Sequence, residues 1–205
     1  MFTERSIRDL LGAFASSAPT PGGGSASALA SALGTSLLMM VASLPRTRSG
    51  SDADRTALAG AARALAPLQA RLTDAIDLDA AAYDRVVAAY RLAKATAAEQ
   101  SARAAAIQDA LRAATEVPLD VMRASVLALD EARTVAAHGH APAASDIGVA
   151  VALLHAGLRG ARLNVAANQA GLKDAGYAAA VGQEAERLAD GAECAAQAAR
   201  TLLDS

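Results

Sequence analysis

An uncharged, apolar run, Ala26 to Leu44, follows directly on the loop-forming sequence Pro19-Thr20-Pro21-Gly22-Gly23-Gly24-Ser25. Two prolines and three glycines disfavour regular structure, whereas Ser25 is a preferred N-cap before an Ala-rich helix. We therefore predict a rigid loop that leads into a buried central helix. The run is almost long enough to cross a membrane, but its five serines or threonines and one glycine indicate a core helix without a membrane partner.

The junction between this loop and the helix is a candidate binding site. Free backbone N–H groups and the positive end of a helix dipole suit an anionic or carbonyl-bearing ligand. Gly22, Gly23, Gly24 and Ser25 are the residues that would bind it. In the alternative interpretation, the glycines only let the chain turn sharply between two packed helices, because a Gly-rich turn alone is a weak motif.

The composition favours closely packed helices. Hydrophobic residues make up 53% of the chain but aromatic residues only 2%, so the apolar content is Ala, Leu and Val. Alanine has the best helix propensity, and small side chains let helix axes approach closely. Because a thin Ala-rich core buries little surface, we expect subunit association to add more.

Charge and cysteine content exclude several classes of protein. A net charge of −2 offers no electrostatic footprint for nucleic acid or an anionic membrane. Cys194 is the single cysteine, so an intrachain disulfide is excluded and a reducing compartment is permitted. Charged residues near the N-terminus interrupt the region where the apolar core of a secretory signal would lie. We expect a cytoplasmic protein.

Helical periodicity extends over nearly the whole chain. A short amphipathic helix is predicted from the spacing of Ile7, Leu10, Leu11 and Phe14. Further helices are predicted over residues 52–99, 98–116, 119–135, from Ser145 or Asp146 as N-cap to about 170, and 177–203, with a loop at 138–142. Pro67 should bend or break its helix, and Pro118 should mark a kink or a restart. The predicted fold is all-α: one domain, residues 1–205, forming an elongated bundle of long, Pro-kinked helices.

One helical stripe combines an acid, two phenols and an amine: Asp79, Tyr83, Tyr90 and Lys94. The alternative is a solvated face with packed tyrosine rings and wet hydroxyls. If one helix carried both, Asp79 and Lys94 would lie about 22 Å apart along its axis. They would then serve opposite ends of a long ligand, or different sites in an oligomer.

A second group of polar residues lies on the helix that begins near Asp146. Asn164 and Asn168 are one turn apart, and their amides could bind the edge of a heterocycle or, equally, fix the register of a neighbouring helix. His138, His140 and His155 lack further ligands at the spacing of a metal site, so no metal is expected.

Several collinear motifs resemble the cyclodeaminase/cyclohydrolase family, which includes the cyclodeaminase part of formiminotransferase-cyclodeaminase and stand-alone bacterial methenyltetrahydrofolate cyclohydrolases. The resemblance covers roughly residues 8–175 and rests on Ala15 to Ser25 followed by the Ala-rich helix, Asp79-Ala80-Ala81-Ala82-Tyr83, Ala89-Tyr90-Arg91-Leu92-Ala93-Lys94, Ala106 to Leu111, Thr115 to Leu119, Ser145-Asp146-Ile147-Gly148-Val149-Ala150 and Leu163-Asn164-Val165. Two motifs depart from the family pattern. Leu92-Ala93-Lys94 replaces the usual Leu-Pro-Lys, and Ser43-Leu44-Pro45 replaces the usual Asn-Leu-Thr.

The resemblance implies an all-helical homodimer, dimerising through helices, that acts on a tetrahydrofolate derivative without a permanently bound cofactor. Asp79 is the first candidate for the catalytic base, with Tyr83 as an orienting hydroxyl and Asp146 as the competing carboxylate. Lys94 would bind the glutamate tail or transfer a proton, and Asn164 and Asn168 would bind the pterin edge. The glycines, Ser25 and Ser145 complete the expected substrate-binding set.

Three functions remain open from the sequence. The absence of an attached formiminotransferase domain favours hydrolysis of methenyltetrahydrofolate to formyltetrahydrofolate. The alternative within the family is a formiminotetrahydrofolate cyclodeaminase that releases ammonia. The third interpretation is a helical folate-binding protein without catalytic activity.

Overall fold

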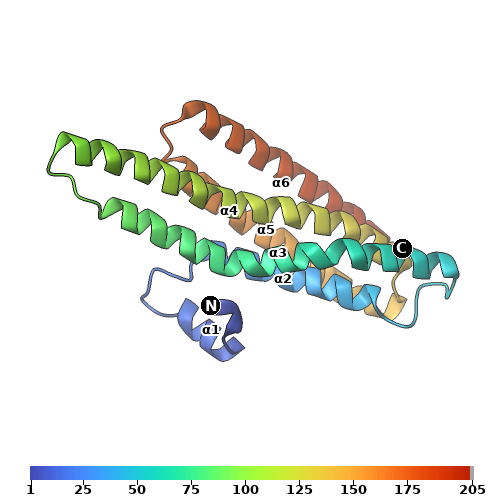
Figure 1. Cartoon of the computed structure of the whole chain (residues 1–205). Coiled ribbons are helices and arrows are strands. Elements are labelled where there is room, and N and C mark those ends of the chain that lie inside the picture. Colours follow the sequence, from blue (N-terminus) through green and yellow to red (C-terminus); the bar gives the residue numbers. More distant parts are fainter. Residues whose placement is uncertain (204–205) are drawn as a thin grey trace.

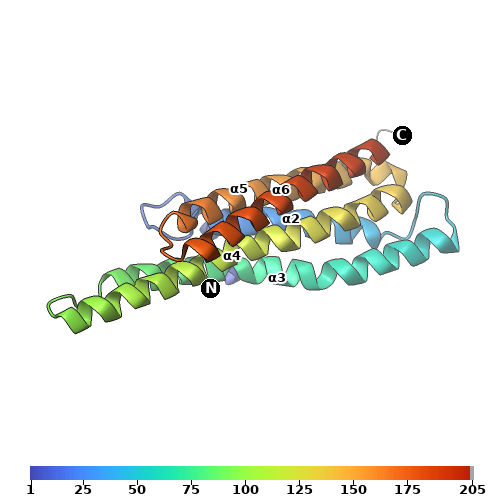
Figure 2. The same ribbon diagram turned by 90° about the horizontal axis from the view of Figure 1, so that it is seen from above.

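The computed structural model describes residues 1–203, and it is an elongated bundle of α-helices (Figures 1 and 2). The helices are α1 (Ile7–Phe14), α2 (Gly23–Ala42), α3 (Asp52–Tyr90), α4 (Ala97–His138), α5 (Ala144–Gln169) and α6 (Ala175–Leu203), with short 3-10 turns at Phe2–Glu4 and Ala141–Ala143. Within this described part no strand forms, and only an isolated β-bridge joins Thr47 to Gly139. The predicted all-α class is confirmed.

Helix α2 is the central element of the bundle, packed against α3 and α5, while α4 contacts α3, α5 and α6. Small side chains allow the close approach of α2 and α5. A Cβ atom added at Gly34 would lie only 2.7 Å from the carbonyl oxygen of Ala150. The serines of the apolar run are also used internally, since the Ser125 hydroxyl donates to Ser31 Oγ at 2.8 Å and both residues are fully buried.

Two helices, α2 and the segment Ala141–Gln169, are long and apolar enough to cross a membrane by length and composition alone. In this structure both pack against other helices of the bundle. The buried serines and threonine of α2 have partners inside the protein, which suits a core helix.

Long helices α3 and α4 form an antiparallel hairpin whose connection, residues 91–96, projects beyond the rest of the bundle (Figures 1 and 2). The helix predicted over residues 52–99 is too long. In the structure α3 ends at Tyr90, and α4 begins with a capping box formed by Thr96 and Glu99. A small apolar cluster of Ala89, Ile107 and Leu111 stabilises this arm.

The prolines do not interrupt their helices. Pro67 lies inside α3 and Pro118 inside α4, so the predicted break at Pro67 and restart at Pro118 are wrong. Packing along the full length of the hairpin outweighs the loss of one backbone hydrogen bond at each proline. The expected bends stay predictions.

Candidate functional site

A cavity of about 290 Å³ lies where the loop before α2 meets α3, α4 and α5. Segments far apart in the sequence each contribute a few side chains to its wall. The lining residues are Pro19, Thr20, Gly22, Gly23, Gly24, Asp79, Tyr83, Val86, Ala114, Asn164 and Asn168. The fold therefore brings together the glycine-rich stretch, the Asp79–Tyr83 motif and the two asparagines.

Helix α2 begins at Gly23, with Gly22 as its N-cap and no capping side chain. The prediction that Ser25 is the N-cap is wrong, because Ser25 lies inside the first turn and is fully buried. The N–H groups of this turn have no partner within the helix. The positive end of α2 thus faces the cavity wall that carries Asp79.

Gly24 is the position where a side chain is excluded. An added Cβ would overlap the Asp79 carboxylate and lie 2.5 Å from its Cγ. At Gly23 the same atom would only touch the amide nitrogen of Asn164 at 3.5 Å, an ordinary van der Waals contact. The glycine-rich stretch is needed here because the α3 carboxylate lies directly against the α2 backbone.

Asp79 is half-buried and contacts the side chain of Ser25. Burial raises the pKa of Asp79 above its usual value of 3.8, while hydrogen bonds from the side chain and backbone of Ser25 partly oppose this rise. No charged side chain is among the causes of the shift. A carboxyl group with a raised pKa in a cavity is suited to proton transfer.

Tyr83 lies one turn after Asp79 and is 44% exposed. It lines the cavity and also, together with Pro19, a neighbouring hollow of about 520 Å³ that continues along α3 to Arg91 and Leu92. Tyr90, predicted in the same stripe, is not among the described residues that line either hollow. Its backbone carbonyl accepts hydrogen bonds from Arg103. The two hollows share Pro19 and Tyr83. The first is lined by the Asp79 carboxylate, and the second by the Asp84 carboxylate and the Arg91 guanidinium.

The two asparagines form hydrogen bonds within the bundle. Asn164 Nδ2 donates to the Gly160 carbonyl in its own helix at 2.9 Å, and Asn168 Nδ2 donates to the Ala114 carbonyl of α4 at 2.8 Å. Ala114 is four residues before Pro118, which has no N–H to donate to that carbonyl. Asn168 therefore supplies the hydrogen bond that the proline removes, and the residue also lines the cavity.

Three predicted site residues lie elsewhere in the chain. Lys94 is exposed in the connection between α3 and α4, so the distance of 22 Å estimated along a continuous helix does not apply. Ser145 and Asp146 lie in the first turn of α5, and Asp146 precedes Asn164 by about 27 Å of helix rise. Neither caps α5, whose N-cap is Ala143 without a side-chain hydrogen bond. Asp79 is thus the carboxylate at the cavity, and Asp146 is remote from it.

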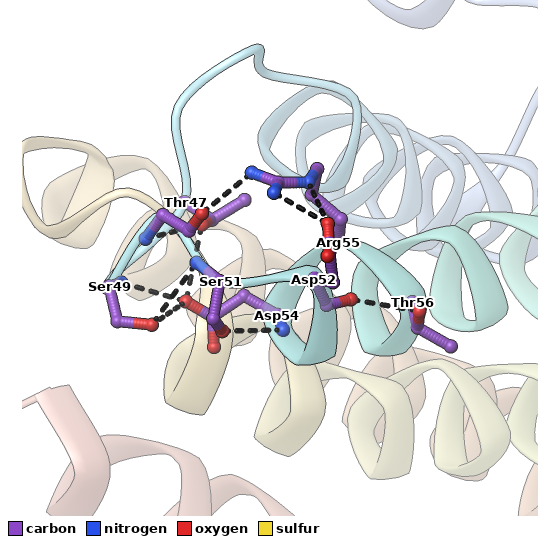
Figure 3. A network of polar contacts seen from close by, with 8 residues as sticks. Thr47, Ser49, Ser51, Asp52, Asp54, Arg55 and Thr56 are labelled. Atoms are coloured by element: carbon purple, nitrogen blue, oxygen red, sulfur yellow. Dashed lines mark hydrogen bonds and ion pairs between the residues drawn. The ribbon is translucent and has the colours of Figure 1, made fainter.

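A separate polar network at the other end of the bundle was missed by the sequence analysis. Figure 3 shows Asp54 surrounded by Thr47, Ser49 and Ser51. Asp54 also bonds to His138 Nδ1 at 2.8 Å, which ties the start of α3 to the end of α4. The hydrogen bonds from His138 and then Ser49 hold the pKa of Asp54 well below its usual range. Ser51 followed three residues later by Asp54 was the available signal, a helix start with an acid in its first turn.

No group of three or more His, Cys, Asp and Glu side chains within residues 1–203 is arranged to hold a metal ion. The cavity itself offers one carboxylate, one phenol, one aliphatic hydroxyl and two amides among its described lining residues. Such groups can bind and orient an organic substrate and move a proton.

Comparison with known proteins identifies relatives of this chain. The family model for formiminotransferase-cyclodeaminase matches residues 6–187. The chain belongs to this family. It is 42% identical over 178 residues to the methenyltetrahydrofolate cyclohydrolase of Methylorubrum extorquens, covering 87% of this chain and 86% of that protein.

Other relatives carry the cyclodeaminase name. The chain is 35% identical over 176 residues to formimidoyltransferase-cyclodeaminase of Mus musculus, covering 83% of this chain but only 31% of that longer protein. The crystal structure of formiminotetrahydrofolate cyclodeaminase from Thermotoga maritima superposes with a TM-score of 0.88 at 25% identity, covering 100% of this chain and 98% of that one. This family member therefore shares its fold with a cyclodeaminase and more of its sequence with a cyclohydrolase.

Proposed function

We propose that this protein is an enzyme of folate one-carbon metabolism that hydrolyses methenyltetrahydrofolate to formyltetrahydrofolate. The observation that carries the proposal is the half-buried Asp79 carboxylate in a cavity open to a long, partly apolar groove. The 42% identity to a named cyclohydrolase over most of both chains supports the choice of reaction. The substrate is itself elongated, with a tricyclic cationic head and an anionic tail.

The chemistry of the reaction matches the groups in the cavity. The methenyl group is a delocalised amidinium cation, so a nearby carboxylate stabilises its binding. Asp79 accepts a proton from a water molecule while the oxygen of that water forms a bond to the bridging carbon. One carbon–nitrogen bond then breaks, Asp79 returns that proton to the departing ring nitrogen, and the hydroxyl group on the bridging carbon releases its own proton to solvent as it becomes the formyl carbonyl. Tyr83 orients the water or the substrate through its hydroxyl group.

The remaining residues would bind the substrate. Asn164 and Asn168 offer amide oxygens to the pterin edge, and the Gly22–Gly24 backbone forms the adjacent wall. Arg91, at the far end of the neighbouring hollow, would bind the glutamate carboxylates. Lys94 is assigned to a tail that extends further or to the site of a second subunit. No permanently bound cofactor takes part in this scheme.

The competing function is cyclodeamination of formiminotetrahydrofolate, which the structural similarity to the Thermotoga maritima enzyme favours. Following methenyl absorbance after adding each substrate separately distinguishes the two. The cyclohydrolase proposal predicts loss of absorbance with methenyltetrahydrofolate. Accumulation of absorbance from formiminotetrahydrofolate, with no loss in the other assay, would contradict it. Folate binding without turnover in either assay would support a non-catalytic binding protein.

We also propose that the protein is a homodimer that associates through α2. The exposed side of this uncharged helix carries Ala26, Leu33 and Met40 at intervals of seven residues, the spacing of a helix-packing seam. Helix α1, which is set off from the bundle in Figure 1, adds Ile7 and Leu11, at 78% and 60% exposure. Leu10 of α1 is already buried, whereas Ile7 and Leu11 remain exposed and would be covered by a partner. A second copy supplies an equally uncharged helix.

We propose that this enzyme is located in the cytoplasm, where its folate substrate would be found. We also propose that it binds neither a membrane nor a nucleic acid. The net charge of −2 supports the absence of binding to polyanions. Cell fractionation with an antibody to the protein tests the location. Recovery in the membrane pellet after a high-salt wash would overturn it.

A further inference from the structure

Ser25 has two hydrogen-bond contacts, and a single hydroxyl proton can point directly at only one of the two acceptors at a time. Its Oγ lies 2.8 Å from the Ile76 carbonyl oxygen and 3.0 Å from Asp79 Oδ2. The side chain is fully buried, so water does not compete for either contact. Ser25 is absent from the residues that line the cavity, although it was predicted to bind substrate.

Counting protons decides how the two contacts can coexist. A carbonyl oxygen only accepts, so the contact with Ile76 requires the Ser25 proton. The contact with Asp79 is then a hydrogen bond only if the carboxyl group is protonated and donates to Ser25 Oγ. When Asp79 is ionised, Ser25 must turn its proton toward the carboxylate and give up the Ile76 carbonyl.

The Ile76 carbonyl tolerates this loss because it lies within α3, where the N–H four residues later is its regular helical partner. Both arrangements of the Ser25 proton therefore leave Ile76 and Asp79 with a hydrogen bond. The alternation costs little reorganisation, since only a hydroxyl rotates.

We propose that Ser25 is a positioning residue that supports Asp79 in both protonation states, as acceptor from the neutral acid and donor to the carboxylate. The role in turnover rests on the proposed hydrolase function, because there Asp79 gains a proton and then loses it. Without the Ser25 hydroxyl, burial would favour the neutral acid, because the carboxylate would keep the backbone N–H of Ser25 but lose the side-chain donor.

The surroundings of Asp79 make Ser25 the dominant partner. Helix α2 carries no charged residue, and the lining residues from the preceding loop, α4 and α5 are Pro19, Thr20, Ala114, Asn164 and Asn168, all uncharged. On α3, Tyr83 is the other titratable group that lines the cavity. A change in the titration of Asp79 can therefore be traced to Ser25.

The experiment is an infrared titration of the protein without substrate, in which the Asp79 carboxyl bands are identified by subtraction of Asp79→Asn. We expect Ser25→Ala to move the titration midpoint of Asp79 to higher pH and to shift the carbonyl band of the protonated acid, which loses its acceptor. Ser27→Ala is the matched control, because Ser27 Oγ donates to the Gly23 carbonyl at 2.7 Å in the same helix. This control should leave the midpoint unchanged.

A second variant covers the case in which Ser25→Ala does not fold. Ser25→Cys retains a weak donor of similar shape and should shift the midpoint in the same direction by a smaller amount. An unchanged midpoint in a folded Ser25 variant would overturn the proposal. The acid limb of kcat/KM should move to higher pH in parallel, and because the infrared readout needs no turnover, it tests Ser25 even if the proposed reaction is wrong.

Discussion

Asp79 is the residue on which the proposed chemistry depends. Asp79→Asn keeps the shape of the side chain but removes the base, so we expect turnover of methenyltetrahydrofolate to fall by about 10²- to 10⁴-fold. Steady-state assay of the folded variant measures this, with circular dichroism as the check of fold. Asp146→Asn, remote from the cavity, should retain activity. Equal loss of activity in the two variants, or loss of activity only in Asp146→Asn, would show that Asp79 is not the catalytic base.

Gly24 tests the close contact between α2 and the Asp79 carboxylate. Gly24→Ala should displace that carboxylate, lowering activity and destabilising the protein by about 1–3 kcal/mol as an overpacked contact. Gly23→Ala meets only an ordinary contact with Asn164 and serves as the control. Urea unfolding and assay of both variants give the comparison. Indistinguishable behaviour of the two would show that the carboxylate does not lie against Gly24.

Besides packing along the hairpin, a hydrogen bond from α5 helps α4 to continue through Pro118. We expect Asn168→Ala to cost about 1–3 kcal/mol, since the buried Ala114 carbonyl loses its donor. In a Pro118→Ala background the backbone N–H of residue 118 can bond to that carbonyl, so the same substitution should cost less. A double-mutant cycle by chemical denaturation measures the coupling. Additive effects would mean that Asn168 does not compensate for the proline.

The Asp54 network links the start of α3 to the end of α4, at the end of the bundle opposite the cavity. Its lowered pKa in the folded state means that Asp54 stabilises the fold above its usual pKa of 3.8, and that this contribution is lost as the pH falls through the lower folded value. The stability difference between the parent and Asp54→Asn should therefore narrow in acid. Thermal unfolding across this pH range measures it, with the exposed Asp52→Asn as control. A stability difference between the parent and Asp54→Asn that stays constant or widens in acid would contradict the lowered pKa of Asp54.

The whole molecule presents an uncharged seam on α2 that its own helices leave open. Leu33 is 51% exposed at the middle of this seam, and Leu33→Asp would bury a charge there in a dimer. We expect the dimer to weaken by about 2 kcal/mol or more, roughly thirtyfold in Kd. Analytical ultracentrifugation measures this, with Leu127→Asp on α4 as an equally exposed control. A monomeric parent would contradict the proposed homodimer, and a dimer unaffected by Leu33→Asp would show that the interface does not include α2.

The sequence by itself determined the fold class and most helix positions. Periodicity and alanine propensity act within a few turns, so α1, the loop before α2 and the break between α5 and α6 could be predicted from local residues. Collinear motifs also predicted the family and singled out the glycines, Asp79 and the asparagines that line one cavity. What the sequence could not give was the partner of each side chain.

Only the tertiary structure decided those partners. Asp79 from α3 lies against the first turn of α2, so Ser25 contacts a carboxylate instead of capping its own helix. Asn168 restores a hydrogen bond lost in α4, whereas Asp146 is separated from the cavity by most of α5. These contacts depend on which helices lie side by side and in what register. Local sequence does not encode that arrangement, because it arises from the packing of the whole bundle.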